Sequence, residues 1–571
     1  MQLRPPTALF AAAGAALTLA SSAAASPVLV YDGGQVSKAD DPALPAAEGS
    51  NPMPASARLC SAKPGATAVA AALSVRKALR RAYDRGDIDR DAYSAFGDVY
   101  SKAKSAWHRL GGNRHTELGA VITTVNTLAA RGQLTASRMT PVFLELQRNT
   151  EWWTRTGATP APEPTTGPGT GRPRKRTACT TAGRIAAGPR VQFKGDPLTL
   201  QYYPGSGLRL QPLANFGKAN ALYNACKGIN TREGTPCEPE KLRALLDRLV
   251  ATAARRSGFL AWEYYFWFGG GRPPWVSGIA TGSALSALAR GASLFREQEQ
   301  QQQQPPAEQP PAQQPPQPAP PPTGGVIPPP PSAKPSAVEP PHDSAYYLSV
   351  AKQALPVYRH SAPVGIRAGG PRGNHYLIYS FSPGLRVGNA FLESLIGLWD
   401  YSEVSGDKRA RSLFIKGDRE AKYELPRYDT GAWSLYSLGG AESDLNYHRV
   451  IRDFLENLCD RTKASAYCSK AALFDQYLHE PARVAIVGPR TARAKKLTRI
   501  AIRVSKISCL SIQILHGDTV IYQPTWYFPR GVHSFTWTPP RKGTYRVHVL
   551  ARDLMSRQSR ADSQLRVLSR R

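Results

Sequence analysis

The spacing of apolar residues separates helical from β-rich parts of the chain. In most of residues 66–156, 190–295 and 343–480 apolar residues recur every three or four positions, with glycine and proline between successive stripes. This spacing is typical of amphipathic helices. The clearest stripe consists of Tyr447, Val450, Ile451, Phe454, Leu455 and Leu458. We therefore predict a mainly α protein whose first helical region, residues 66–156, is a bundle.

Two parts of the chain predict β-structure instead. Residues 190–203 contain two short runs of apolar and β-branched residues, as expected of a small β element. Over residues 482–571 the apolar period is two, as at Ile500 and Ile502, and turn residues such as Gly517 separate the runs. Short alternating strands with turns between them predict an immunoglobulin-like β-sandwich over residues 482–571.

Three segments have compositions that do not predict a packed core. Residues 157–189 are rich in proline, threonine and glycine and are expected to be a linker. Residues 296–342 begin with a glutamine run and continue with proline-rich repeats, which predicts a disordered insert within the second helical region. The small-residue stretch that ends near Pro64 is also expected to be mobile.

The first 25 residues have the features of a signal peptide. Arg4 precedes an apolar run over residues 8–20, and small residues follow over 21–25. The apolar run is too short to span a bilayer comfortably. We therefore expect residues 1–25 to be removed on export and the protein to be secreted or extracytoplasmic.

The charge of the chain indicates the class of partner. It has 73 Lys and Arg against 42 Asp and Glu, a formal net charge of +31. Such an excess favours nucleic acid, an anionic surface or an acidic polysaccharide. Because a secreted protein rarely meets nucleic acid as a substrate, we expect an acidic polysaccharide, no nucleic acid, and at most weak association with an anionic cell surface. The oligomeric state is not indicated.

Seven cysteines make disulfides plausible in an exported protein. We hypothesise three pairings: Cys226 with Cys237, Cys459 with Cys468, and Cys60 with Cys179. The first two would close short local loops, the third would tie the ends of the N-terminal helical region, and Cys509 would be unpaired. No two cysteines have CxxC spacing, so we expect no zinc site.

Several short motifs together carry a resemblance to a known family. They are Tyr376–Pro383, Asn389–Asp400, Leu425–Gly431, Ser434–Tyr436 and Asn446–His448. In this order they resemble the C-terminal domain of the D-glucuronyl C5-epimerases, and Gln201–Gly217 and Trp262–Gly278 resemble segments of bacterial members. The resemblance implies a secreted bacterial member in which residues 190–295 and 343–480 form an (α/α) toroid with a small β element.

The resemblance also implies a reaction and its residues. A C5-epimerase removes the proton beside the carboxylate of a glucuronic acid in a polysaccharide and returns one to the opposite face, which needs two acid–base groups and no cofactor or metal. By position in the motifs, Tyr379 and Tyr447 are the expected catalytic pair. Tyr436, His448 and Arg427 are expected to hold the substrate.

Two further aromatic residues are candidates for substrate binding. Tyr203 and Trp275 lie in the two earlier segments, and their rings can stack on a sugar.

A tyrosine with an ordinary pKa near 10 would also need nearby positive charge to act as a base near neutral pH. We expect arginines to supply that charge.

The chain departs from the animal enzymes at a position beside the expected catalytic tyrosine. The animal enzymes carry a carboxylate immediately before the tyrosine matched to Tyr379, whereas this chain has Ile378. An aliphatic side chain cannot move a proton. Three functions therefore stay open: a uronate C5-epimerase, a uronate lyase on the same fold, and a non-catalytic protein that binds acidic polysaccharide or the cell wall.

Overall fold

The computed structural model describes residues 26–45, 73–155, 188–229, 236–303 and 342–570. About 48% of it is helix and 26% is strand, so the fold is mixed rather than mainly α. The predicted signal peptide (1–25) lies outside the described residues, as do residues 157–187 of the predicted linker and residues 304–341 of the predicted insert.

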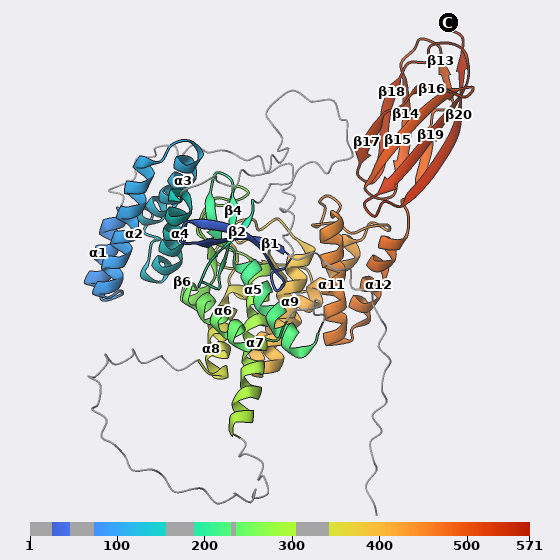
Figure 1. The fold of residues 1–571 in the computed structure, drawn as a ribbon. Coiled ribbons are helices and arrows are strands. Elements are labelled where there is room, and N and C mark those ends of the chain that lie inside the picture. Colours follow the sequence, from blue (N-terminus) through green and yellow to red (C-terminus); the bar gives the residue numbers. More distant parts are fainter. Residues whose placement is uncertain (1–25, 46–72, 156–187, 230–235, 304–341, 571) are drawn as a thin grey trace, which may run out of the picture.

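The described part of the predicted N-terminal bundle is helical throughout, with short turns between its helices (Figure 1). The helices are α1 (Val75–Asp84), α2 (Arg90–Arg109), α3 (Gly112–Ala130) and α4 (Ala136–Thr154). Side-chain caps start the first two: Ser74 accepts a hydrogen bond from the backbone N–H of Lys77, and Asp89 accepts one from that of Ala92. Their buried faces form one apolar core with the neighbouring sheet.

That sheet has five strands and includes a segment expected to be mobile. In spatial order the strands are β2 (Gln35–Asp41), β1 (Ser26–Asp32), β3 (Arg190–Phe193), β4 (Thr199–Tyr203) and β5 (Gly207–Leu210). The expectation of a mobile stretch is therefore wrong for residues 26–41. Gly33 and Gly34 have positive φ and close the turn between β1 and β2. The free edge of β3 then supplies a parallel partner for β1.

Eight helices of the described chain make up the central region. They are α5 (Pro212–Lys227), α6 (Pro239–Ala251), α7 (Gly278–Gln303), α8 (Ser344–Ala354), α9 (Gly388–Ser405), α10 (Lys408–Glu424), α11 (Leu445–Thr462) and α12 (Ser465–His479). Two 3-10 turns and three small hairpins connect them: η1 (Leu355–Tyr358), η2 (Leu425–Tyr428), β6 (Ala254–Arg256), β7 (Phe259–Ala261), β8 (Glu263–Tyr264), β9 (Trp275–Val276), β10 (Arg367–Gly369) and β11 (Asn374–Tyr376). A single large apolar cluster lies between the helices.

Helices α7 and α9 approach each other closely because glycines face each other at their crossing. A Cβ atom at Gly397 would lie 2.2 Å from the carbonyl oxygen of Gly282, and one at Gly282 would lie 2.5 Å from that of Glu393. Helix α7 also continues to Gln303, so the expected disorder from residue 296 is wrong for residues 296–303. Glutamate and glutamine are good helix formers, which lets α7 extend beyond its buried part.

The last part of the chain, residues 482–570, is the C-terminal β-module. Its strands are β12 (Val484–Gly488), β13 (Thr491–Arg493), β14 (Thr498–Val504), β15 (Ser508–His516), β16 (Thr519–Tyr522), β17 (Thr525–Phe528), β18 (Gly531–Trp537), β19 (Gly543–Asp553) and β20 (Gln558–Leu568). A three-stranded sheet, β12-β14-β18, and a larger sheet, β13-β20-β19-β15-β16 with β17 on β15, share one apolar core. The module stands at the end of α12, on the opposite side of the molecule from α1–α4 (Figure 1).

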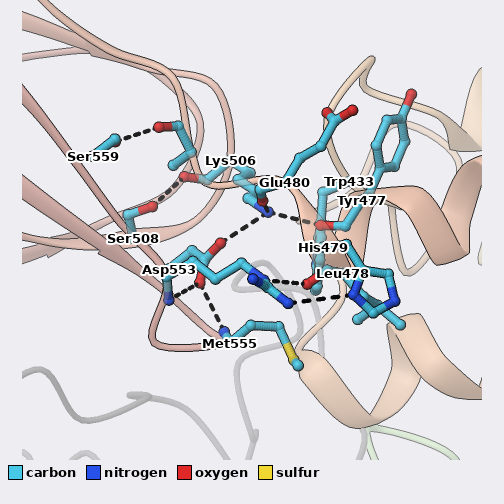
Figure 2. A network of polar contacts seen from close by, with 12 residues as sticks. Trp433, Tyr477, Leu478, His479, Glu480, Lys506, Ser508, Asp553, Met555 and Ser559 are labelled. Atoms are coloured by element: carbon cyan, nitrogen blue, oxygen red, sulfur yellow. Dashed lines mark hydrogen bonds and ion pairs between the residues drawn. The ribbon is translucent and has the colours of Figure 1, made fainter.

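A buried lysine joins this module to the helical region (Figure 2). The Lys506 ammonium, 2% exposed, forms an ion pair of 2.9 Å with Asp553 and donates hydrogen bonds to the carbonyl oxygens of Tyr477 (2.8 Å) and Glu480. Asp553 and Lys506 belong to the module, whereas the two carbonyl oxygens lie at the end of α12. Backbone carbonyls thus satisfy an ammonium that burial would otherwise make costly, and the two parts are held in a defined orientation.

Three of the cysteine expectations can be compared with the structure. Cys226 bonds Cys237 and Cys459 bonds Cys468, which confirms both short-loop disulfides. Cys509 is also disulfide-bonded, so the expectation that it is unpaired is wrong. The proposed partners Cys60 and Cys179 lie outside the described residues. Within the described part of the chain, no helix is both long and apolar enough to cross a bilayer.

Candidate active site

A cavity of about 760 Å³ opens between the small β elements and helices α5, α7, α9 and α11. A cavity of this size can enclose a few sugar rings. Four of the seven predicted site residues line it: Tyr203, Trp275, Tyr379 and Tyr447. These residues are separated by up to 244 positions in the sequence, and the fold brings them to one surface.

One wall of the cavity is aromatic. It comprises Tyr203, Tyr264, Phe266, Phe268, Trp275 and Tyr379. The rings of Tyr264 and Trp275 stack with centroids 4.2 Å apart, and Tyr379 meets Trp275 edge-on at 5.5 Å. A bridge between Ser277 and Tyr379 sets this arrangement, because it ties the segment after β9 to the loop before α9. Such a wall can stack against the apolar face of a sugar.

Tyr447 faces the cavity from the first turn of α11. Asp444 caps this helix by accepting a hydrogen bond of 2.9 Å from the backbone N–H of Tyr447. The Tyr447 ring, 1% exposed, packs edge-on against Tyr436 with centroids 5.0 Å apart. Tyr447 and Tyr379 belong to the same cluster of buried residues, and both line the cavity. Tyr436 does not line it and instead supports Tyr447 from behind.

His448 points away from the cavity, contrary to its expected role in holding substrate. Its ring is fully buried and stacks on Trp433 with centroids 3.5 Å apart. Nδ1 lies 2.8 Å from the Ser434 hydroxyl oxygen, and Nε2 lies 2.9 Å from the Phe474 carbonyl oxygen. Burial lowers the pKa of His448 to about 3, so the ring is neutral. Successive residues of a helix are about 100° apart, so Tyr447 and His448 cannot face one cavity together.

Arg427 also lies elsewhere. It lines a separate surface hollow with Arg386 and the glycines at 369, 370 and 384. Arg427 stands in η2, which directs it to the outside of the helical region. Arg427 is therefore absent from the cavity lining, contrary to its expected role in holding the substrate.

Glu393 is a cavity residue that the sequence analysis did not select. It projects from α9, is 7% exposed, and accepts a hydrogen bond of 2.5 Å from the Ser283 hydroxyl on α7. Burial raises the pKa of this carboxyl, which favours its protonated form. Its sequence signal is a lone carboxylate in an otherwise apolar part of the Asn389–Asp400 motif. Ile378, directly before Tyr379, also lines the cavity. The cavity therefore does have a carboxyl group, but that group comes from α9 and not from position 378.

The charges of the cavity do not form a strongly positive field. Three arginines line it, against five carboxylates. Burial alone would raise the pKa of Asp400, but Arg290 at 2.9 Å and Arg461 at 2.7 Å lower it overall. Asp400 therefore offsets one of these two arginine charges, and the expected excess of arginine near the tyrosines is not found. Among the described residues, no three His, Cys, Asp or Glu side chains gather as metal ligands.

Comparisons with known proteins cover the part of the chain that forms much of this cavity. Residues 339–476 match the family model of the D-glucuronyl C5-epimerase C-terminus. A D-glucuronyl C5-epimerase of Caenorhabditis elegans is 35% identical over 105 residues, which are 16% of this chain and 17% of that protein. The chain therefore matches well under two thirds of this relative. Tyr379, Glu393 and Tyr447 lie within residues 339–476, whereas Tyr203 and Trp275 lie outside them.

A solved structure also aligns with a small part of the chain. It is the crystal structure of the CARDB domain of the PF1109 protein from Pyrococcus furiosus, which is 19% identical. The alignment covers 16% of this chain and 94% of that domain, with a TM-score of 0.13.

Proposed function

From the premise that residues 339–476 belong to the D-glucuronyl C5-epimerase family, we propose that the protein is a uronate C5-epimerase acting on a glucuronic-acid-containing polysaccharide. One observation carries the proposal. Tyr379 and Tyr447, selected as an acid–base pair from two separate motifs, line the same cavity. Glu393 adds a buried carboxyl group to that cavity.

The reaction needs two proton-transfer groups on opposite faces of the sugar ring. One tyrosine, as its phenolate, takes the C5 proton, and the electron pair of the broken C–H bond moves into the adjacent carboxylate. The other tyrosine, as a neutral phenol, gives its proton to the opposite face of C5. One proton is lost and one gained, the configuration at C5 inverts, and no co-reactant is consumed. We assign the two roles to Tyr379 and Tyr447.

Glu393 has a role distinct from that of the tyrosines. Loss of the C5 proton places a second negative charge on the substrate carboxylate, and a hydrogen-bond donor at this position stabilises it. A buried carboxyl group whose raised pKa favours the protonated form is such a donor. Glu393 therefore takes the part of an electrostatic stabiliser, and the proposal does not need a carboxylate at Ile378.

The other candidate residues are assigned by their position. Tyr203 and Trp275, in the aromatic wall, stack on sugar rings on either side of the reacting one. Tyr436 supports Tyr447, and His448 anchors the start of α11 from inside the helical region. Arg427 has no part in the chemistry.

Architecture and location complete the proposal. Helices α5, α7, α9 and α11 line the cavity and alternate along the chain with α6, α8, α10 and α12, which supports an (α/α) toroid. The two sheets of the C-terminal β-module support an immunoglobulin-like sandwich. The disulfides suit an oxidising compartment, which supports secretion and an extracellular acidic polysaccharide as partner.

One observation favours a second candidate, a non-catalytic polysaccharide-binding protein. Ile378 stands where the animal enzymes carry a carboxylate, and a binding protein would tolerate that loss. Incubation of the protein with hyaluronan, a glucuronic-acid polymer, and with unsulfated heparosan in heavy water separates the candidates. Deuterium at C5 without chain cleavage, read by NMR and mass spectrometry, identifies the epimerase. Binding without exchange identifies the second candidate, and an unsaturated, ultraviolet-absorbing chain end identifies a lyase.

A further inference from the structure

The C-terminal β-module carries a disproportionate share of the positive charge. Residues 482–571 contain 18 Lys and Arg against 3 Asp and no Glu, a formal charge of +15 in a chain of +31. The cavity, by contrast, has more carboxylates than arginines in its lining. The positive charge that favours a polyanionic partner is therefore concentrated away from the candidate active site.

Five exposed arginines form a row on the outer face of the larger sheet. They project from the adjacent strands β13, β20 and β19 and are Arg493, Arg566, Arg546, Arg560 and Arg552. The strand register places Arg560 diagonally across from Arg552. It places Arg566 diagonally across from Arg546 in the same way, and Arg493 beyond Arg566. From Arg552 to Arg493 the row runs about 34 Å along the strands, at ~6.8 Å for every two residues.

Little in the module compensates this arginine row. Asp518, which is fully exposed, pairs with Arg546 at 2.7 Å, and Asp562 lies 3.9 Å from Arg560. Exposed pairs of this kind contribute little to stability, so an incoming anion can replace them. Among the described residues, no ion pair forms with the other three arginines. The row is therefore available to a ligand with several negative charges in a line.

The other side chains on this surface favour a sugar polymer over a nucleic acid. Between the arginines, the outward positions of the three strands include Thr491, Thr544, Gln558 and Gln564, whose hydroxyl and amide groups can bond sugar hydroxyls. These outward positions carry no Phe, Tyr or Trp. Single-stranded nucleic acids are usually held by aromatic side chains on which bases stack.

The row also begins where the module meets the helical region. Arg552 is followed directly by Asp553, which bonds Lys506 at the junction shown in Figure 2. We propose that the arginine row binds an extended acidic polysaccharide along the outer face of the larger sheet and so retains the polymer beside the helical region. The proposal rests on the proposed function only for the identity of the polymer.

The test compares two full-length variants that lose the same charge. The row variant carries Arg493→Gln, Arg552→Gln, Arg560→Gln and Arg566→Gln. The matched control carries Lys77→Gln, Arg90→Gln, Lys102→Gln and Arg109→Gln, all at exposed positions of α1 and α2 or their ends. Binding of hyaluronan, of carboxyl-reduced hyaluronan and of duplex DNA is measured at about 150 mM salt, where weak long-range attraction is screened.

The expected result is specific to the row and to the carboxylates. The row variant should bind hyaluronan at least tenfold more weakly than the wild type, whereas the affinity of the control for hyaluronan should stay within twofold of the wild type. Carboxyl-reduced hyaluronan should bind weakly to the wild type and to both variants. Equal weakening in both variants would mean that total charge matters and would overturn the proposal. So would loss of DNA binding with hyaluronan binding retained, or equal binding of native and carboxyl-reduced hyaluronan.

A parallel measurement separates this proposal from the proposed function. Deuterium exchange at C5 is followed on a short glucuronate oligosaccharide, too short to span from the row to the cavity. The row variant should exchange at the wild-type rate. If the wild type shows no exchange but the row still binds polymer, the proposed epimerase fails and the binding surface stands. Exchange without row-dependent binding would overturn the binding surface and leave the epimerase in place.

Discussion

The ring of His448 lies almost parallel to the indole of Trp433, with planes 9° apart and centroids 3.5 Å apart. Lys506, from the C-terminal β-module, lies over the same indole at 5.0 Å. His448 directly follows Tyr447, which lines the cavity. The module therefore contacts the structure that supports the start of α11, and its influence can reach the candidate active site through only two intervening side chains.

Replacing Lys506 should therefore affect both stability and activity. In Lys506→Met the Asp553 carboxylate would stay buried without its cation, which typically costs about 3–5 kcal/mol. We expect a lower urea midpoint and slower C5 exchange. Lys496→Met, at an exposed position of the same module, should change neither. A Lys506 variant with wild-type stability would show that the junction does not depend on this ion pair.

The proposed catalytic roles of the two tyrosines can be tested by removing single hydroxyl groups. Tyr447→Phe and Tyr379→Phe should each slow C5 exchange by about 10²–10⁴-fold, the usual contribution of a general acid or base, and leave hyaluronan binding intact. Tyr401→Phe removes the hydroxyl of a buried tyrosine that bonds the Leu348 carbonyl outside the cavity, and should keep the exchange rate. Unchanged exchange in Tyr447→Phe would remove Tyr447 from the mechanism.

Replacing Glu393 should lower activity and raise stability at alkaline pH. Glu393→Gln keeps the shape of the side chain but weakens the hydrogen bond to the developing charge, so exchange should fall by about 10²–10³-fold. Burial raises the pKa of Glu393 in the folded protein, so the wild type loses stability as pH rises through that pKa. The variant should then have a higher melting temperature than the wild type at alkaline pH, and the difference should vanish in acid.

Two further measurements sharpen the Glu393 prediction. Wild-type exchange should decline as Glu393 ionises, whereas the low residual exchange of Glu393→Gln should lack that decline. Glu456→Gln, at an exposed position of α11, serves as the control and should match the wild type in both rate and melting temperature. A Glu393 variant with full activity would leave the site without its proposed stabiliser.

The buried His448 should make the folded protein less stable as the pH falls. Its pKa is lowered by burial to about 3 in the folded protein and is near 6.5 in the unfolded chain. Between these values the unfolded chain binds a proton that the folded protein does not, so stability falls as pH decreases from about 6.5, by at most ~1.4 kcal/mol per pH unit. His448→Gln should flatten the urea midpoint between pH 7 and pH 5. Equal slopes in the two proteins would contradict this assignment.

Local features of the chain were sufficient to predict many of its elements. Helical spacing such as that of Tyr447, Ile451 and Leu455 reports which face of a helix is apolar, and alternation such as that of Ile500 and Ile502 reports a strand with one buried face. Both depend on residues close in sequence, so they can be read without knowing the fold. The same is true of the disulfides that close short loops, because chain ends separated by about ten residues meet easily.

Other features depend on contacts between distant segments and could not be predicted in this way. The β1–β2 hairpin is ordered beside β3, which is far away in sequence. The motif around Tyr447 predicted a cluster of site residues, but rotation about the helix axis turned His448 inward, and η2 turned Arg427 outward. Glu393 became a cavity residue because facing glycines let α7 and α9 approach closely. Periodicity describes one element at a time, whereas a site is made by the packing of several.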